Sequence, residues 1–203
     1  MLRFAGRAAH MLNHDEAKLK EVNKVLKAAG SKEYNGKTKV HHFAEILHKE
    51  VGVEKIAKNT TNKLHYKVAI HYGCHFLKPS AVRGLDNPEA PQILEDLVEA
   101  TGAVSVDYRH KQMCCGAGGG VRANTPDVAL KMTEEKLKYL DEVEVDLILD
   151  VCPFCHLQYD RGQKDLGREK QYPVLHLSQL YGLAFGLDRK VLGFGLHDTE
   201  VEI

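Results

Sequence analysis

Five cysteines constrain this chain more than any other feature of its sequence. Their spacing is C-x39-CC-x36-C-x-x-C, and they are Cys74, Cys114, Cys115, Cys152 and Cys155. Thiolates are soft ligands for iron and zinc, so a vicinal pair and a C-x-x-C can bind one centre if folding brings them together. Five thiols cannot all pair as disulfides, and a four-ligand zinc site also leaves one over. An iron–sulfur cluster with five thiolate ligands would use them all.

Composition and charge argue against several other classes of protein. The 203 residues are enough for one large domain, or for a domain with an appendage. Lys+Arg and Asp+Glu number 28 each, so no net field favours nucleic acid or an anionic membrane. The longest apolar runs, such as residues 145–151, are too short to span a membrane, and residues 1–4 carry no secretory signal. Free thiols without a signal predict a cytoplasmic protein.

The first 62 residues predict a helical segment. Apolar residues recur at helical spacing between charged ones from Leu12 to Leu26, and residues 30–36 supply turn signals. A second amphipathic helix is expected over residues 40–51. A polar break at residues 59–62 then changes the composition. We therefore expect residues 1–62 to form a helical segment and residues 63–203 to form a cysteine-rich domain.

Short apolar runs alternate with helical stretches from Lys67 onwards. Strands are expected at residues 68–72, 104–106, 147–151 and 174–176, and helices at residues 88–101, 125–140, from 154 and 178–186. This alternation predicts an α/β domain, in which helices cover a parallel sheet of about four strands. The cysteines follow the first three expected strands. Because ligands in such sheets gather outside the carboxyl ends of strands, we expect all the thiols at one edge.

A run of glycines, Gly116 to Gly120 with Ala117 inside it, follows the vicinal cysteines directly. Glycine lets the backbone approach a bulky cluster and donate N–H groups to its sulfurs. Two alternatives are a flexible loop without a ligand and a dinucleotide-binding G-x-G-x-x-A over residues 118–123. The dinucleotide alternative lacks a tight strand-to-helix turn and a convincing acid for the ribose.

The C-x-x-C at Cys152 and Cys155 would, on its own, suggest a thioredoxin-like redox pair. That interpretation leaves Cys74 and the vicinal pair without a role, and adjacent cysteines are poorly placed to bond to each other. A zinc site is the serious inorganic alternative. His156, expected on the helix that contains Cys155, is a minor candidate for the site.

Several basic residues flank the cysteine loops. His75 adjoins Cys74 and could bind a carboxylate or donate a proton near neutral pH, or it could only hydrogen-bond a cluster sulfur. Lys78, Arg83 and Arg122 could bind anionic substrate groups, although each could equally be a solvated charge.

Three blocks of sequence carry a family resemblance. They are residues 71–80 (HYGCHFLKPS), residues 114–122 (CCGAGGGVR) and residues 151–155 (VCPFC). In this order they resemble the carboxy-terminal cysteine-rich "CCG" domain in the B subunit of CoB–CoM heterodisulfide reductase from methanogens, over about residues 8–186. Related domains occur in glycolate oxidase iron–sulfur subunits, lactate-utilisation proteins and other quinone- or thiol-linked reductases. The HYGCH and CPFC sequences favour the methanogen protein.

The resemblance implies a cofactor and its ligands. In that family a CCG motif holds a non-cubane [4Fe-4S] cluster through five cysteines, here Cys74, Cys114, Cys115, Cys152 and Cys155, with the Gly116 backbone beside them. Family members carry two such motifs, and the mixed disulfide of coenzymes B and M is reduced between them. The amino-terminal motif is absent from this sequence. We therefore expect a longer polypeptide, or a separate one, to supply the other half.

The resemblance also implies an activity and partners. It predicts reduction of the CoB–CoM heterodisulfide to two thiols in methanogenesis, together with the two other heterodisulfide reductase subunits, the flavin-containing A and the iron–sulfur C. His75, Lys78 and Arg122 are the groups that this sequence offers to the anionic substrate, and exposed Leu and Phe are expected within residues 1–60. The alternatives are an iron–sulfur component of a 2-hydroxy-acid oxidase or fumarate-linked reductase, and a non-catalytic electron-relay or zinc-stabilised module.

Overall fold

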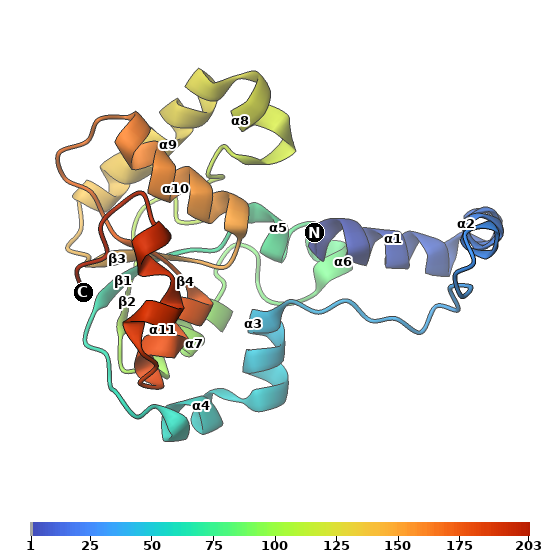
Figure 1. Cartoon of the computed structure of the whole chain (residues 1–203), viewed down its shortest axis with the longest axis horizontal. Coiled ribbons are helices and arrows are strands. Elements are labelled where there is room, and N and C mark those ends of the chain that lie inside the picture. The colour runs from blue at the N-terminus through green and yellow to red at the C-terminus, as the bar shows by residue number, and fades with distance from the viewer. Residues whose placement is uncertain (1) are drawn as a thin grey trace.

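A four-stranded parallel sheet forms the centre of the protein. The computed structural model describes the backbone of residues 2–203 and the side chains from residue 5 onwards. Met1 and the first side chains, on which the expected lack of a secretory signal depends, lie outside the described part. Figure 1 shows a helix-covered body from which a helical arm projects.

The sheet confirms the fold class expected from the alternating pattern. Its strands are β1 (Lys67–His71), β2 (Val104–Val106), β3 (Leu147–Asp150) and β4 (Val174–His176). They are all parallel, in the order β2-β1-β3-β4. β2 and β3 therefore lie on opposite sides of β1. This change of direction places a topological switch point at the carboxyl ends of β1 and β3, where His71 is in register with Asp150.

Helices cover both faces of the sheet (Figure 1). One apolar layer joins Val68 and Ile70 of β1 to helices α7 (Ile93–Glu99) and α11 (Leu177–Ala184). The other layer joins Ala69 to α9 (Pro126–Asp141) and α10 (Pro153–Asp165). Because side chains alternate along a strand, His71 lies on the same face as Ala69. The last residue of β1 therefore points toward α9 and α10.

Side-chain hydrogen bonds determine where two of the helices begin, which the apolar pattern of the sequence does not predict. α7 begins at Ile93 instead of near Pro88, because Oδ2 of Asp86 accepts the backbone N–H groups of Gln92 and Ile93 at 2.7 and 2.9 Å. A capping box at His42 starts α3 (Phe43–Ile46), which continues as a π-helical turn (Leu47–Val51) and is followed by α4 (Val53–Asn59). Ala44 and Ile56 of this stretch belong to the core. The expected domain boundary after residue 62 stays a prediction.

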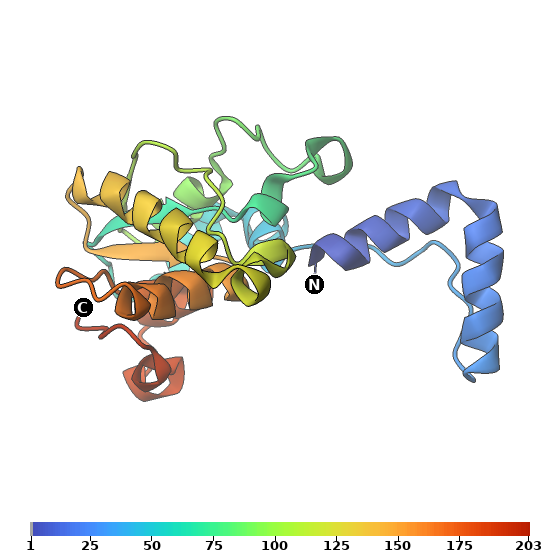
Figure 2. The ribbon, with the colours of Figure 1, turned by 90° about the horizontal axis from the view of Figure 1, so that it is seen from above.

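The arm consists of α1 (Leu2–His14) and α2 (Glu16–Ala28), and Figures 1 and 2 both show it standing away from the body. Asp15 caps α2 by accepting the N–H of Lys18 at 3.0 Å. No side chain of α2 is buried. Among the described side chains of residues 5–60, the exposed large apolar ones are Met11, Val25 and Ile46. Leu2 and Phe4, on which part of the expectation of exposed Leu and Phe falls, lie outside the described side chains.

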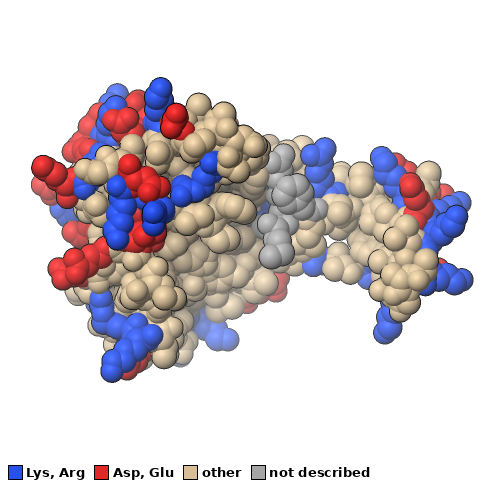
Figure 3. Space-filling view, turned by 45° about the horizontal axis from the view of Figure 1, so that its top comes forward, with Lys and Arg blue, Asp and Glu red and all other residues tan. Residues whose placement is uncertain are grey.

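Short helical turns complete the body: α5 (Cys74–Leu77), α6 (Ser80–Arg83), a 3-10 turn (Gly118–Gly120), α8 (Val121–Asn124), and 3-10 turns at Arg189–Leu192 and Phe194–Leu196. Figure 3 shows charged side chains gathered on the arm and on the far end of the body, with few on the surface between them. Within the described residues, no helix is long and apolar enough to cross a membrane.

Candidate metal centre

Two cysteine segments start at the switch point of the sheet. Gly73 follows β1 and allows a sharp turn with φ of 71°, after which Cys74 opens α5. Cys152 follows β3 and is the N-cap of α10, so Cys155 lies in the first turn of that helix. A Cβ on Gly73 would lie 3.5 Å from both the Cys152 Cβ and the Cys155 Sγ. These are ordinary contact distances, so it is the positive φ that favours glycine here, and the β1 turn lies in contact with the C-x-x-C.

The third segment is the loop between β2 and α9, which carries the vicinal pair. Buried groups hold this loop in place. The Lys136 ammonium of α9 donates to the carbonyls of His110 and Lys111, both at 2.7 Å. The Lys111 side chain in turn forms an ion pair with Glu95 of α7, which also accepts the Tyr72 hydroxyl. The loop is therefore fixed to both helical layers.

Gly116 allows the vicinal pair to approach α9. Its φ is 90°, in the region that favours glycine, and a Cβ there would lie 3.0 Å from the Ala129 carbonyl oxygen. Its N–H points to the Cys114 Sγ at 3.4 Å. Gly116 thus packs closely against α9 and directs one N–H toward a cysteine sulfur, while the expected approach of the glycine run to a cluster stays a prediction.

The five thiols form one continuous chain of hydrogen-bond contacts. Cys74 contacts Cys114, Cys114 contacts Cys115, Cys115 contacts Cys155, and Cys155 contacts Cys152. Cys115 and Cys155 are buried, whereas the other three are half-buried. Segments that follow three different strands therefore bring every cysteine of the chain into one site.

Hydrogen bonds between the thiols divide them into two groups, one with lowered and one with raised pKa values. Hydrogen bonds from Cys115 and then Cys74 lower the pKa of Cys114. A hydrogen bond from Cys155 lowers the pKa of Cys152 to about 6, despite partial burial, and the N–H groups of Cys155 and Phe154 add to it. A hydrogen bond to Cys114 raises the pKa values of Cys74 and Cys115, hydrogen bonds to Cys115 and then Cys152 raise the pKa of Cys155, and burial adds to the effect in all three. Such a site binds a soft cation readily, because two of its ligands ionise first.

This division predicts an order of alkylation in the metal-free protein. A half-buried thiolate reacts faster than a buried thiol, so at pH 7 iodoacetamide should modify Cys152 well before Cys155. Peptide mass spectrometry at increasing times measures both rates, and the urea-unfolded chain, in which the two rates should become similar, is the control. Modification of Cys155 first in the folded protein would contradict the thiol arrangement.

The predicted basic residues lie at different distances from the thiols. His75 is half-buried in α5, and its Cε1 would lie 4.0 Å from a Cβ on Gly118, so it faces the glycine run. Lys78 is exposed directly after α5. Arg122 turns toward α10, with Nη1 donating to Gln158 at 2.7 Å and Nη2 3.7 Å from Asp165. His75 thus lies beside the cysteine loops, whereas Arg122 is already paired.

Two minor candidates have structural partners. Arg83 donates from Nε to the Phe76 carbonyl at 3.2 Å and lies 3.5 Å from Glu45. His156 places Nδ1 3.0 Å from the buried Asp150, which also accepts the Cys152 N–H. These contacts brace the β1 and β3 turns.

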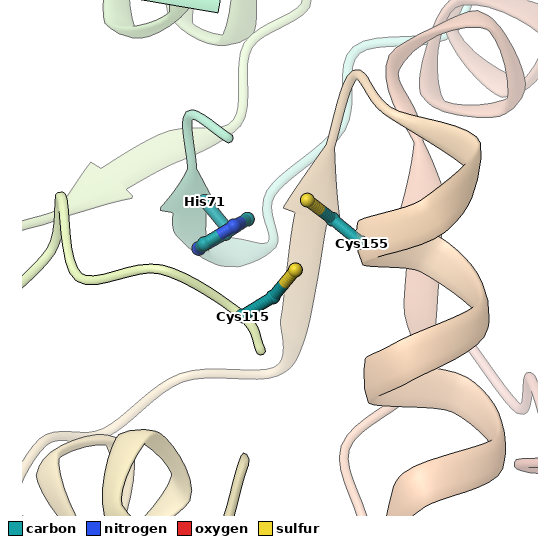
Figure 4. Close-up of side chains that lie close together, drawn as sticks. All are labelled: His71, Cys115 and Cys155. Carbon is teal, nitrogen blue, oxygen red and sulfur yellow. The ribbon is translucent and has the colours of Figure 1, made fainter. Parts of the chain in front are cut away.

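Two buried residues of the site were missed by sequence reasoning. His71 lies beside Cys115 and Cys155, with the three ligand atoms all within 4.8 Å of one another (Figure 4). Lys136 lies beneath the cysteine loop with a 1% exposed side chain. Burial lowers the pKa of Lys136 to about 7, and the neighbouring cysteines oppose this shift. Alternation along β1 could have identified His71, but Lys136 has the sequence pattern of an ordinary helix-surface lysine.

Residues 68–160 match the family described as the cysteine-rich domain CCG. The match begins in β1 and ends in α10, so it contains all five cysteines, His71 and Lys136. A crystal structure of a hypothetical protein from Helicobacter pylori has a similar fold, with a TM-score of 0.64 at 14% identity, over 96% of this chain and 35% of that chain. The protein is therefore an α/β protein with a CCG domain.

Sequence relatives narrow this class. The B subunits of two CoB-CoM heterodisulfide reductases, from Methanosarcina mazei (ferredoxin-dependent) and Methanosarcina acetivorans (ferredoxin/F(420)H(2)-dependent), are 50% and 51% identical over 175 residues, which is 84% of this chain and 58% of each relative. The 8-methylmenaquinol:fumarate reductase membrane anchor subunit of Wolinella succinogenes is 34% identical over 179 residues, 85% of this chain and 61% of that protein. Over most of its length the chain is therefore similar to heterodisulfide reductase B subunits, the resemblance that its motifs predicted, and it spans 58% of the length of the two Methanosarcina relatives.

Proposed function

We propose that the five cysteines hold one iron–sulfur cluster, and that the chain supplies it to a reductase that cleaves the CoB–CoM heterodisulfide. The observation that carries this proposal is the continuous contact among the thiols, in which every cysteine takes part. A zinc site with four ligands would leave one thiol unused. The non-cubane [4Fe-4S] form expected from the family resemblance is part of the proposal.

The surroundings of the thiols fit an anionic cluster. Cluster sulfurs accept backbone N–H groups, and Gly116 already donates one to Cys114. The buried Lys136 ammonium is attracted to the sulfurs of Cys115, Cys155 and Cys114. A buried cation is costly unless a negative charge lies near it, so this lysine favours a negatively charged occupant. When bound, a cluster supplies single electrons at this site.

The proposed substrate rests on the names of the two Methanosarcina relatives, both of which are B subunits of CoB–CoM heterodisulfide reductases. Reduction breaks the S–S bond, consumes two electrons and two protons, and releases two thiols. We assign His75, beside the glycine run, to holding a proton for a product sulfur. Lys78 is the first choice for an anionic substrate group, because it is exposed and Arg122 is already paired.

We also propose that the chain works as one subunit of a larger complex. The reductase relatives are themselves subunits, and the family pairs two CCG motifs around the disulfide, so another polypeptide segment should supply the second cluster. We propose that the other heterodisulfide reductase subunits, the iron–sulfur C and the flavin-containing A, deliver the electrons. A cytoplasmic location stays a prediction from the free thiols.

Metal and sulfide analysis after anaerobic purification tests the cofactor. The chain should contain about four iron and about four acid-labile sulfide per polypeptide, as in a [4Fe-4S] cluster. One zinc per chain without sulfide would contradict the proposal and favour the zinc-stabilised module. Apo protein reconstituted with iron and sulfide, measured beside apo protein given zinc alone, controls for metal exchange during purification.

Replacing His75 by alanine should separate cluster binding from turnover. The His75→Ala variant should keep its iron and sulfide, because the thiols are the ligands, yet lose about 10²-fold or more in heterodisulfide turnover in the reconstituted complex. His65→Ala, at an exposed position before β1, is the matched control and should behave as wild type. Unchanged kinetics of His75→Ala would remove this residue from the site.

A second candidate function is electron transfer within a fumarate-linked reductase. The specific observation that favours it is the 34% identity to the Wolinella fumarate reductase protein. The reconstituted complex distinguishes the two. Thiol production from the CoB–CoM heterodisulfide supports the first function, whereas fumarate-dependent oxidation of the cluster without thiol production supports the second.

A further inference from the structure

The last residue of β1, His71, is buried against the candidate metal centre. Its side chain is 1% exposed, and it shares the α9 and α10 face of the sheet with Ala69. Figure 4 shows its ring and the sulfurs of Cys115 and Cys155 around a common space. One ligand atom from each of the three residues lies within 4.8 Å of the others. His71 is therefore a side chain of the site although it is not a thiol.

A tyrosine determines which nitrogen of His71 carries the proton. The Tyr159 hydroxyl of α10 lies 3.2 Å from Nδ1 and, among the side chains described from residue 5 onwards, has no other hydrogen-bond partner. Both side chains are buried, so the hydroxyl must donate its proton to this nitrogen to satisfy it. Nδ1 is therefore an acceptor, and the proton of the neutral imidazole lies on Nε2.

The other ring nitrogen, Nε2, has no protein partner among the described residues, although the imidazole is completely enclosed. A donor left unpaired in the interior loses its hydrogen bonds to water without gaining any in return. A sulfur-rich occupant of the site would accept this hydrogen bond.

We propose that His71 is a positioning residue which donates a hydrogen bond from Nε2 to a sulfur of the metal centre held by Cys115 and Cys155, and so raises its reduction potential. The inference rests on the proposed function, because it needs a redox-active occupant. Hydrogen bonds to cluster sulfurs stabilise the reduced, more negative form. Direct ligation of iron by Nε2 is the competing arrangement, but it requires the tautomer that leaves the Tyr159 hydroxyl without an acceptor.

Redox titration of the cluster-loaded chain, followed by electron paramagnetic resonance, tests whether His71 donates this hydrogen bond. His71→Leu should shift the midpoint potential to more negative values at unchanged iron and sulfide content. His71→Gln keeps an N–H donor and should shift it less, while His65→Leu, at an exposed histidine, should leave it unchanged. Equal potentials in wild type and His71→Leu would overturn the proposal.

Isotope labelling gives a measurement that needs no variant. In the cluster-loaded wild-type chain labelled with ¹⁵N-histidine, pulsed paramagnetic resonance should show the weak nitrogen coupling of a hydrogen bond. The strong coupling of an iron-bound nitrogen would overturn the proposal. Absence of iron and sulfide from the wild type would instead defeat the proposed function alone. Long-range ¹H–¹⁵N correlation in the zinc-loaded chain would then still decide the tautomer, and a proton on Nδ1 would count against the inference.

Discussion

Each of the five Cys→Ser variants is expected to lose the iron–sulfur cluster, as loss of acid-labile sulfide and of the visible absorption. The expectation follows from the thiol contacts, in which no cysteine is spare. Serine keeps nearly the same volume but offers a hard hydroxyl in place of a soft thiolate. The effect should be greatest at Cys115, because it is buried and contacts both Cys114 and Cys155.

Measured together, the five Cys→Ser variants distinguish a zinc site from an iron–sulfur cluster. A zinc site uses four ligands, so one of the five substitutions would leave full metal content. A five-thiolate cluster tolerates none of them. Thermal unfolding of the metal-free variants, compared with metal-free wild type, shows whether a loss reflects the missing ligand or a damaged fold. Any single variant with wild-type iron and sulfide would contradict the five-ligand arrangement.

The fold could be predicted from the sequence because strand-like apolar runs alternate regularly with helix-like amphipathic stretches. Short apolar runs separated by amphipathic helices allow few arrangements besides a helix-covered parallel sheet. The cysteines then follow from the sheet, since the ends of β1, β2 and β3 meet at one edge. Helix ends were less predictable. The start of α7 depends on Asp86, a loop residue that accepts two N–H groups from outside the helix.

The buried polar residues of the site could be predicted only in part. His71 follows Ala69 and Val68 in β1, so alternation alone places it on the face that carries the thiols. Lys136 gives no such signal, because lysine on a helix usually faces solvent and its burial depends on two carbonyls of a distant loop. The partners of Arg122 were equally unpredictable: its position beside the cysteine loop suggested substrate binding, which stays a prediction, while the structure shows its guanidinium held by Gln158 and Asp165.

The ion pair between Glu95 and Lys111 predicts the largest effect of a substitution that touches no cysteine. Both side chains are buried, and Glu95 also accepts the Tyr72 hydroxyl at the end of β1. Glu95→Gln keeps the shape but leaves the Lys111 ammonium without its buried partner. Removing one member of a buried pair typically costs about 3–5 kcal/mol. The exposed Asp107, 3.5 Å from Lys111, should recover part of this, so we expect a loss of about 3 kcal/mol.

Because Lys111 lies three residues before Cys114, this loss should also reach the metal centre. For a chain of this size, about 3 kcal/mol corresponds to a fall of about 6–12 °C in Tm. Calorimetry of the metal-free protein measures the fall, and iron content after reconstitution should drop with it, since a loosened loop no longer presents the vicinal thiols. Glu142→Gln breaks the exposed ion pair with Arg109 and is the matched control, with little effect expected on either quantity. A Glu95→Gln protein with the Tm and iron content of the control would show that the cysteine loop is held by Lys136 alone.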